Sequence, residues 1–83
     1  PFNPVTKINY DLPDESRVSL KVYNAIGQTV ATLIDGVESA GCRSVEWNTS
    51  AVASGIYFYR FEATSLSNPG KIFIKVKKMI LLR

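Results

Sequence analysis

Apolar and polar residues alternate with a period of two along most of this 83-residue chain. In segment 57–63, the odd positions include Tyr57, Tyr59 and Phe61, while Arg60 stands between them. Such alternation over four to eight residues indicates a strand with one buried face, because successive side chains of a strand point to opposite sides. No segment shows the 3.6-residue repeat of an amphipathic helix. The sequence therefore predicts an all-β protein.

The alternating segments are separated by residues that favour turns, such as the pairs Asp35-Gly36 and Ala40-Gly41. Short strands spaced by roughly 8–12 residues are typical of a sandwich or barrel. We expect an immunoglobulin-like antiparallel β-sandwich of about seven strands. The alternating segments are 7–12, 17–22, 44–47, 57–63 and 71–77, with a short strand at 29–33.

The length of the chain suits one domain, residues 1–83. Hydrophobic residues make up 46% of the sequence, which is enough for a core. The sequence starts at Pro1 with neither Met nor a signal peptide, so we expect it to be a piece of a larger protein. We expect this domain to be monomeric.

Residues that support catalysis or metal binding are scarce. The chain has no His and a single cysteine, Cys42, which excludes the usual catalytic triads, an ordinary zinc site and an internal disulfide. The seven acidic residues are scattered, and the only adjacent pair, Asp14-Glu15, falls in a predicted turn. We therefore expect no enzymatic activity, no metal and no other cofactor. Cys42 is interpreted as a small residue in or beside a strand.

The single tryptophan, Trp47, alternates with Val45 and is expected to anchor the core, as a lone Trp often does in a small sandwich. A different interpretation uses aromatic rings on the surface as a platform for sugars. Tyr23 and Phe58 are the better candidates for such a platform.

The last thirteen residues carry five cations and no acid. Such a basic end can attract nucleic acid or anionic surfaces. The same composition is expected for the polar face of a final edge strand, where lysines keep the edge soluble. We favour this second interpretation and expect no nucleic-acid partner. The cations are Lys71, Lys75, Lys77, Lys78 and Arg83.

In the predicted final strand, Ile72, Ile74 and Val76 alternate with lysines and are expected to face the core. Continuing the same alternation would place Lys78 on that buried face. A β-bulge near Lys77-Lys78 would avoid this and would turn Met79 and Leu81 inward.

Three sequence blocks occur in a characteristic order: P-F-N-P at the start, S-G-I-Y-F-Y-R in the middle and K-M-I-L-L-R at the end. In this combination the chain resembles the C-terminal sorting domain of type IX secretion cargo from the Bacteroidetes and related phyla. It is also similar to the immunoglobulin-like domain of the flagellar hook-capping protein. The motif residues of the first two blocks are Pro1, Asn3, Pro4, Gly55, Tyr57 and Tyr59.

The resemblance implies that the chain is the C-terminal domain of a larger protein and that it has a non-catalytic role as an address. An outer-membrane translocon would read the domain, and a sortase-like protease would often remove it. The cargo would be a catalytic or adhesive domain upstream in the same chain, which would reach the cell surface or the medium after transit through the periplasm. The candidate signal residues are Lys75, Lys77, Lys78, Met79, Leu81 and Arg83.

Two other functions remain as alternatives. The domain would be a structural module of a multidomain extracellular enzyme or of a hook-capping protein, or, as a weaker alternative, a carbohydrate-binding module.

Overall fold

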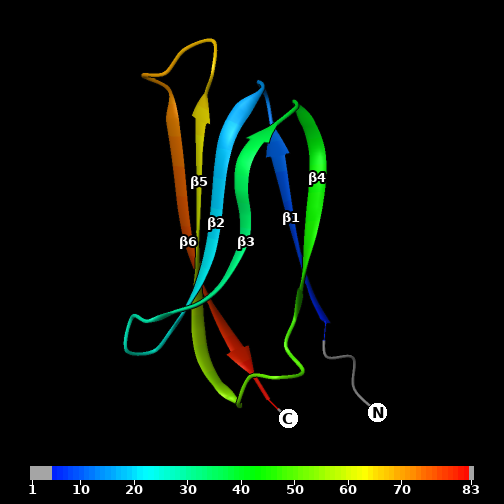
Figure 1. Cartoon of the computed structure of the whole chain (residues 1–83), viewed down its shortest axis with the longest axis vertical. Coiled ribbons are helices and arrows are strands. Elements are labelled where there is room, and N and C mark those ends of the chain that lie inside the picture. The colour runs from blue at the N-terminus through cyan, green and yellow to red at the C-terminus, as the bar shows by residue number, and fades with distance from the viewer. Residues whose placement is uncertain (1–4, 83) are drawn as a thin grey trace.

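A computed structural model describes residues 5–82, which form six strands and no helix (Figure 1). Within these residues no helix is long and apolar enough to cross a membrane. The strands are β1 (Val5–Leu12), β2 (Ser16–Asn24), β3 (Thr29–Glu38), β4 (Gly41–Asn48), β5 (Gly55–Ser65) and β6 (Ile72–Leu81).

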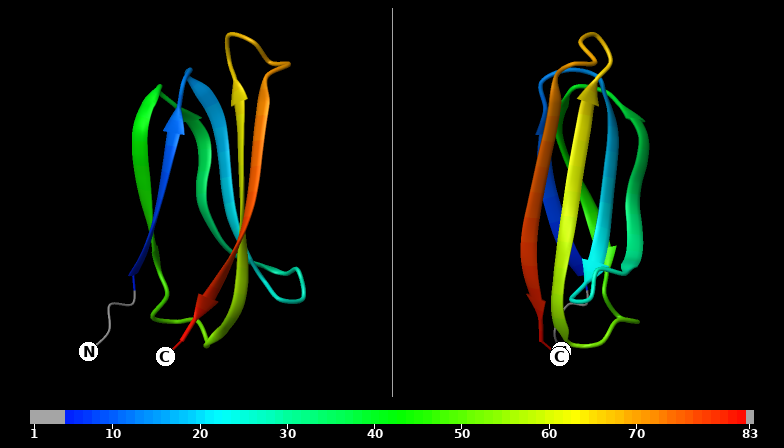
Figure 2. Two further views of the ribbon diagram at one scale, coloured as in Figure 1. Left: turned by 180° about the vertical axis from the view of Figure 1, so that it is seen from behind. Right: turned by 90° about the vertical axis from the view of Figure 1, so that its left-hand side faces the viewer.

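The strands form two antiparallel sheets that face one another (Figure 2). The larger sheet has the order β3-β2-β5-β6, and the smaller sheet pairs β1 with β4. The short segment from Leu12 to Ser16 carries the chain from the smaller sheet to the larger one. The predicted all-β sandwich is confirmed.

The core lies between the two sheets and is centred on β2. Val18, Leu20 and Val22 of this strand are fully buried. Full burial of a Val or Leu side chain contributes about 1.5–3 kcal/mol to folding. Strand β5 adds its odd-numbered residues, and the smaller sheet adds Ile8, Leu12 and Trp47. The alternation predicts these inward faces correctly.

The middle of the chain differs from the prediction, because residues 5–82 hold six strands where about seven were expected. Asp35-Gly36 does not form a turn. Strand β3 runs through both residues, which pair with Ser19 and Val18 of β2. Since a complete partner strand is available there, pairing outweighs the local turn preference of the Asp-Gly dipeptide.

The orientation of β6 is the main correction. Phe73 pairs with Ala63 and Lys75 pairs with Phe61, so the odd-numbered residues of β6 share the inner face with the odd-numbered residues of β5. Directly paired residues point to the same side of a sheet. Ile72, Ile74 and Val76 therefore lie on the outer face, and the prediction that they line the core is wrong.

The expected bulge near Lys77-Lys78 is also absent, because the pairing of β5 with β6 runs without a shift from Thr64↔Ile72 to Gly55↔Leu81. An unbroken strand turns Met79 and Leu81 inward, where both pack against the core at partial burial. These two residues reach the inner face because the whole strand has the opposite orientation from the one predicted.

Candidate functional site

Strand β6 is the part of the described chain that is most available to a partner. It pairs only with β5 and forms the outer edge of the larger sheet (Figure 1). Residues 72–78 are exposed on both faces of the strand. An edge strand also presents a row of unpaired backbone N–H and C=O groups. Most of the predicted signal residues lie on this strand.

The signal candidates do not form a single basic face. Lys75 and Lys77 project from the inner face of β6, whereas Lys78 projects from the outer face. Met79 and Leu81 follow on the inner face and have a packing role. Arg83 lies outside the described residues.

The lysines of β6 are not neutralised by neighbouring acids. Among residues 5–82, no carboxylate lies within ion-pair distance of Lys75, Lys77 or Lys78. By contrast, Lys71 in the preceding loop has its Nζ 3.7 Å from Oδ2 of Asp14. The charge of β6 is therefore available to a ligand.

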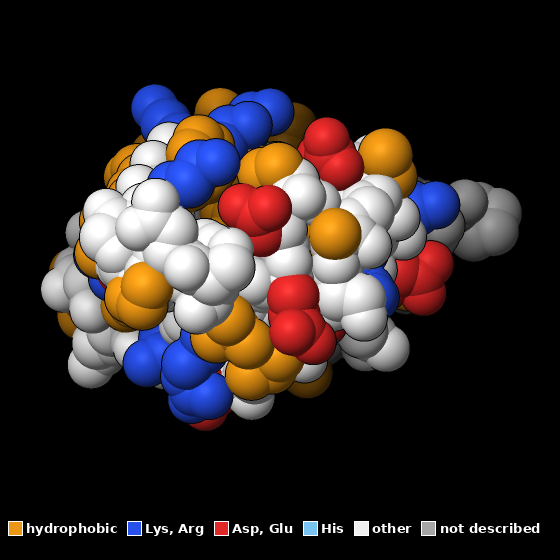
Figure 3. Space-filling view, turned by 90° about the horizontal axis from the view of Figure 1, so that it is seen from above, with side chains coloured by type: hydrophobic (Ala, Val, Ile, Leu, Met, Phe, Trp, Pro, Cys, Tyr) orange, Lys and Arg blue, Asp and Glu red, His pale blue; other side chains and the backbone are white. Residues whose placement is uncertain are grey.

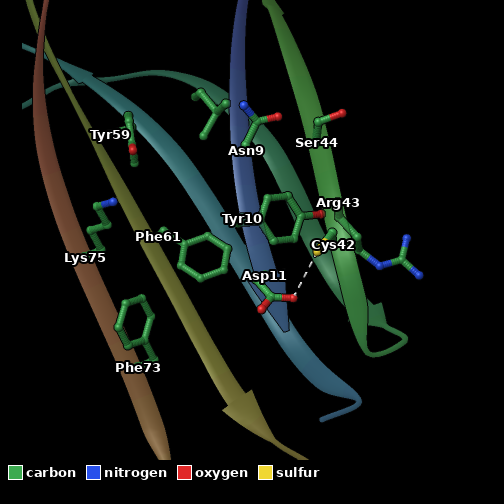
Figure 4. Close-up of a pocket in the computed structure, with 11 residues that line it drawn as sticks. Asn9, Tyr10, Asp11, Cys42, Arg43, Ser44, Tyr59, Phe61, Phe73 and Lys75 are labelled. Atoms are coloured by element: carbon green, nitrogen blue, oxygen red, sulfur yellow. Dashed lines mark hydrogen bonds between the residues drawn. The ribbon is translucent and has the colours of Figure 1, made fainter. Parts of the chain in front are cut away.

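An open cleft of about 710 Å³ lies between the two sheets on the side of β6 (Figure 4). Aromatic rings cross it from strand to strand. The ring centroids of Tyr10 and Phe61 are 5.1 Å apart, and those of Phe61 and Phe73 are 6.1 Å apart. Lys75 points into the cleft beside Phe73. The cleft therefore combines an aromatic floor with a cation.

Polar groups border the cleft on the smaller sheet. The hydroxyl of Tyr10 donates a hydrogen bond to Glu38 of β3. The thiol of Cys42 lies 3.6 Å from Oδ1 of Asp11, as the dashed line in Figure 4 shows. Desolvation, followed by the hydrogen bond and the charge of Glu38, raises the pKa of Tyr10 to about 12. Tyr10 thus stays a neutral donor. Cys42 is exposed at this border.

The outer face of β6 carries an apolar stripe, which we define as Ile72, Ile74, Val76 and Ile80. Each of these side chains is at least half exposed. Seen along the long axis, hydrophobic and cationic side chains lie next to one another at the surface (Figure 3). Tyr23 and Phe58 pair on this outer face of the sheet and are half-buried.

The remaining motif residues support the lower part of the core. The buried ring of Tyr57 makes an edge contact with Trp47 at 5.5 Å, and its hydroxyl donates to the carbonyl oxygen of Ala53 at 2.7 Å. Tyr59 is also buried and borders the cleft. Gly55 begins β5 with a φ of 158°. Pro1, Asn3 and Pro4 lie outside the described residues.

Sequence reasoning missed the cleft and the role of Phe73 in it. The only signal was that Phe73 falls on the lysine side of the final alternating segment. A face that combines one aromatic residue with lysines is polar on average, so its composition predicts that it faces solvent. In the structure this face borders the core. Within residues 5–82, no group of three or more His, Cys, Asp or Glu side chains is placed to hold a metal ion.

A family model described as "Secretion system C-terminal sorting domain" matches residues 1–75. The match extends from the start of the sequence into the first half of β6 and covers every residue that lines the cleft. Comparisons with curated proteins and with solved structures gave no significant match.

Proposed function

This chain belongs to the family of secretion system C-terminal sorting domains, and from that premise we propose that it is the export address of a larger cargo protein in type IX secretion. The cargo is an upstream catalytic or adhesive domain of the same polypeptide. An outer-membrane translocon reads the domain, and a sortase-like protease removes it. The cargo reaches the cell surface or the medium after passing through the periplasm.

One observation carries the proposal at the level of residues: β6 presents lysines that have no acidic partner among residues 5–82. A receptor can read such a strand through its charges and its free backbone edge together. We assign recognition to Lys75, Lys77, Lys78 and Arg83, and we assign Met79 and Leu81 the task of holding the strand in place.

The alternative of a sugar-binding platform has less support. Sugar rings stack on aromatic faces, and a row of rings must be nearly coplanar to form a flat platform. The rings of Tyr10 and Phe61 are tilted by 43°, and those of Phe61 and Phe73 by 64°. The first pair is tilted and the second makes an edge contact, so the three rings do not form a flat platform.

The proposal is tested by changing the β6 cations without touching any apolar residue. The variant carries K75Q, K77Q, K78Q and R83Q, and a matched control carries K7Q, R17Q, K21Q and R60Q, which removes the same charge from β1, β2 and β5. Each form is fused to the C-terminus of a periplasmic reporter in a bacterium with type IX secretion. Reporter at the surface and in the medium is then measured.

We expect the unmodified chain and the control to export the reporter and the β6 variant to export several-fold less. The purified β6 variant should unfold within about 1 kcal/mol of the unmodified chain, because exposed charges contribute little to stability. If the unmodified fusion stays in the periplasm, the sorting function is wrong for this chain. Equal export of all three forms would instead show that the cations of β6 are not what the receptor reads.

A further inference from the structure

The smaller sheet ends one strand short of the sheet that it faces. Tyr10 of β1 packs on Phe61 of β5, and Phe73 of β6 lies beyond Phe61 in the same row of rings. Strand β1 therefore covers β5. Phe73 is left 58% exposed, although it is on the inner face of the sandwich.

The edge of β1 that faces this gap is unpaired. Strand β1 pairs with β4 alone among the described strands, and β4 lies on the side toward β3. Four consecutive residues of β1, residues 8–11, line the cleft. Since β4 occupies one edge of β1, the other edge of residues 8–11 has no strand partner among the described strands, and its backbone N–H and C=O groups are free to pair. The cleft thus has an open backbone edge as one wall.

We propose that this cleft is a strand-acceptor site, in which an extended segment of a partner protein pairs with the free edge of β1. The segment becomes the third strand of the smaller sheet and lies over the first half of β6. Its inward side chains are apolar over Phe73 and acidic opposite Lys75 and Lys77. The inference rests on the proposed function in one respect: because the chain is proposed to be an export address, the partner is assigned to the export machinery.

Charge complementarity determines the chemistry of this partner. Lys75 points into the cleft, the only acid in the cleft lining is Asp11, and Lys77 follows Lys75 on the same inner face (Figure 4). Neither Lys75 nor Lys77 has a carboxylate within ion-pair distance in residues 5–82. A basic segment would therefore be repelled, whereas an acidic one would gain charge-assisted hydrogen bonds with these lysines.

The position of β6 argues against a second copy of this chain as the occupant. An added strand would lie about 4.8 Å from β1, the usual spacing of neighbouring strands in a sheet. A second copy that paired through its own β1 would bring its own four-stranded sheet, whose β6 also extends past β1. The two β6 strands would then compete for one position. A single extended segment has no such conflict.

The test uses this 83-residue chain and two synthetic peptides that are blocked at both ends. In the acidic peptide, every second residue is meant to face the cleft, and these residues are two valines followed by two glutamates. Threonine occupies the positions between them. In the control peptide, lysine replaces both glutamates. Binding is measured by titration calorimetry at low salt, and the position of the peptide is mapped by amide chemical shifts and hydrogen exchange.

We expect the acidic peptide to bind, to slow the exchange of β1 amides and to shift the resonances of Phe73. The control peptide should bind at least about tenfold more weakly, since it brings like charges together. K75Q/K77Q should weaken binding of the acidic peptide by about tenfold, whereas R17Q/K21Q, which removes two charges from the outer face of β2, should leave binding unchanged.

Three results would overturn the inference: equal binding of both peptides, shifts confined to the outer face of β6, or no binding of the acidic peptide to a folded chain. Dimerisation of the chain through β1 in sedimentation experiments would overturn it as well. None of these results involves export, so export without peptide binding contradicts only the acceptor site. Peptide binding without export contradicts only the sorting function.

Discussion

At the scale of single residues, Trp47 links the smaller sheet to the larger one. The indole is only 5% exposed and meets the edge of Tyr57, a β5 residue, across the core. The hydroxyl of Tyr57 is fixed in turn by the carbonyl of Ala53, in the loop that joins β4 to β5. The tryptophan therefore packs on a side chain that is itself held in place.

Replacing Trp47 by Ala should cost about 3–5 kcal/mol of unfolding free energy, the usual range for emptying a site of this size. Small domains have a total stability of about 5–15 kcal/mol, so the variant will be close to unfolding at room temperature. Tyr57→Phe is the matched control, because it removes one hydrogen bond and should cost about 0.5–1.5 kcal/mol. Denaturant melts give both values. A loss below about 1 kcal/mol for Trp47→Ala would contradict its role as the core anchor.

Tyr10 gives a prediction about alkaline pH. Its pKa is raised to about 12, first by desolvation and then by Glu38, from an ordinary value near 10. The folded state therefore holds this proton more tightly than the unfolded state does. The resulting contribution to stability is complete below pH 10 and is lost as the pH rises through about 12.

Absorbance titration of the folded chain at 295 nm should show one tyrosine ionising near pH 12, and Tyr10→Phe should remove that step. The stability of the unmodified chain should also fall more steeply than that of the variant between pH 10 and 12. An unchanged titration curve in the variant would contradict the assignment to Tyr10.

At the scale of the strands, β6 shows where the sequence stops predicting the structure. Alternation identifies a strand in 71–77 but leaves open which set of residues faces inward. The more apolar set, Ile72, Ile74 and Val76, is the natural choice, and it is wrong. The loop between Ser65 and Lys71 fixes the register with β5, and a shift of one residue exchanges the two faces of a strand.

The strands that were predicted correctly differ from β6 in their position. Strands β2 and β5 lie in the middle of the larger sheet, so one face of each is fully covered and must be apolar. Strand β6 is at the edge, where the smaller sheet does not cover its upper half. Because neither face of this half is buried, neither face has to be apolar. The sequence therefore predicts the orientation of residues at the candidate site less well than it predicts the orientation of core residues.

The outer orientation of the apolar stripe can be tested with Ile74→Thr and Val76→Thr together. Both side chains are at least half exposed, so the double variant should unfold within about 1 kcal/mol of the unmodified chain. Threonine is used because it keeps the preference for strand conformation. Binding of a hydrophobic dye to the folded protein should fall, since exposed apolar surface is lost.

The control for this double variant is Val18→Thr/Val22→Thr, which places hydroxyls at two fully buried positions of β2. Burying a hydroxyl without a partner costs about 1–3 kcal/mol at each site, so this control should be severely destabilised. Comparable losses in the two double variants would mean that the stripe of β6 faces the core.

At the scale of the whole molecule, stability is concentrated on one side of the sandwich. The fully buried side chains belong to β2, which is paired along both edges by β3 and β5. The smaller sheet has two strands, and β6 has one paired edge and an inner face that is exposed from Phe73 to Lys77. The same asymmetry that gives the chain a stable centre leaves β1 and β6 open to a partner.

This asymmetry predicts the order in which backbone amides exchange with deuterium. Slow exchange requires both a hydrogen bond and a neighbourhood that rarely opens, and both conditions are met best in β2 and β5. Their paired amides should exchange only through global unfolding, whereas amides of β6 from Ile72 to Lys77 should exchange at least about tenfold faster. Paired amides of β1 should fall between these groups, because Ile8 and Leu12 are buried although one edge of the strand is free. Exchange measured by NMR on the isolated chain gives the order directly. If residues 72–77 of β6 were as slow as β2, the upper half of this strand would belong to the stable centre, and the asymmetry of the sandwich would not determine its local stability.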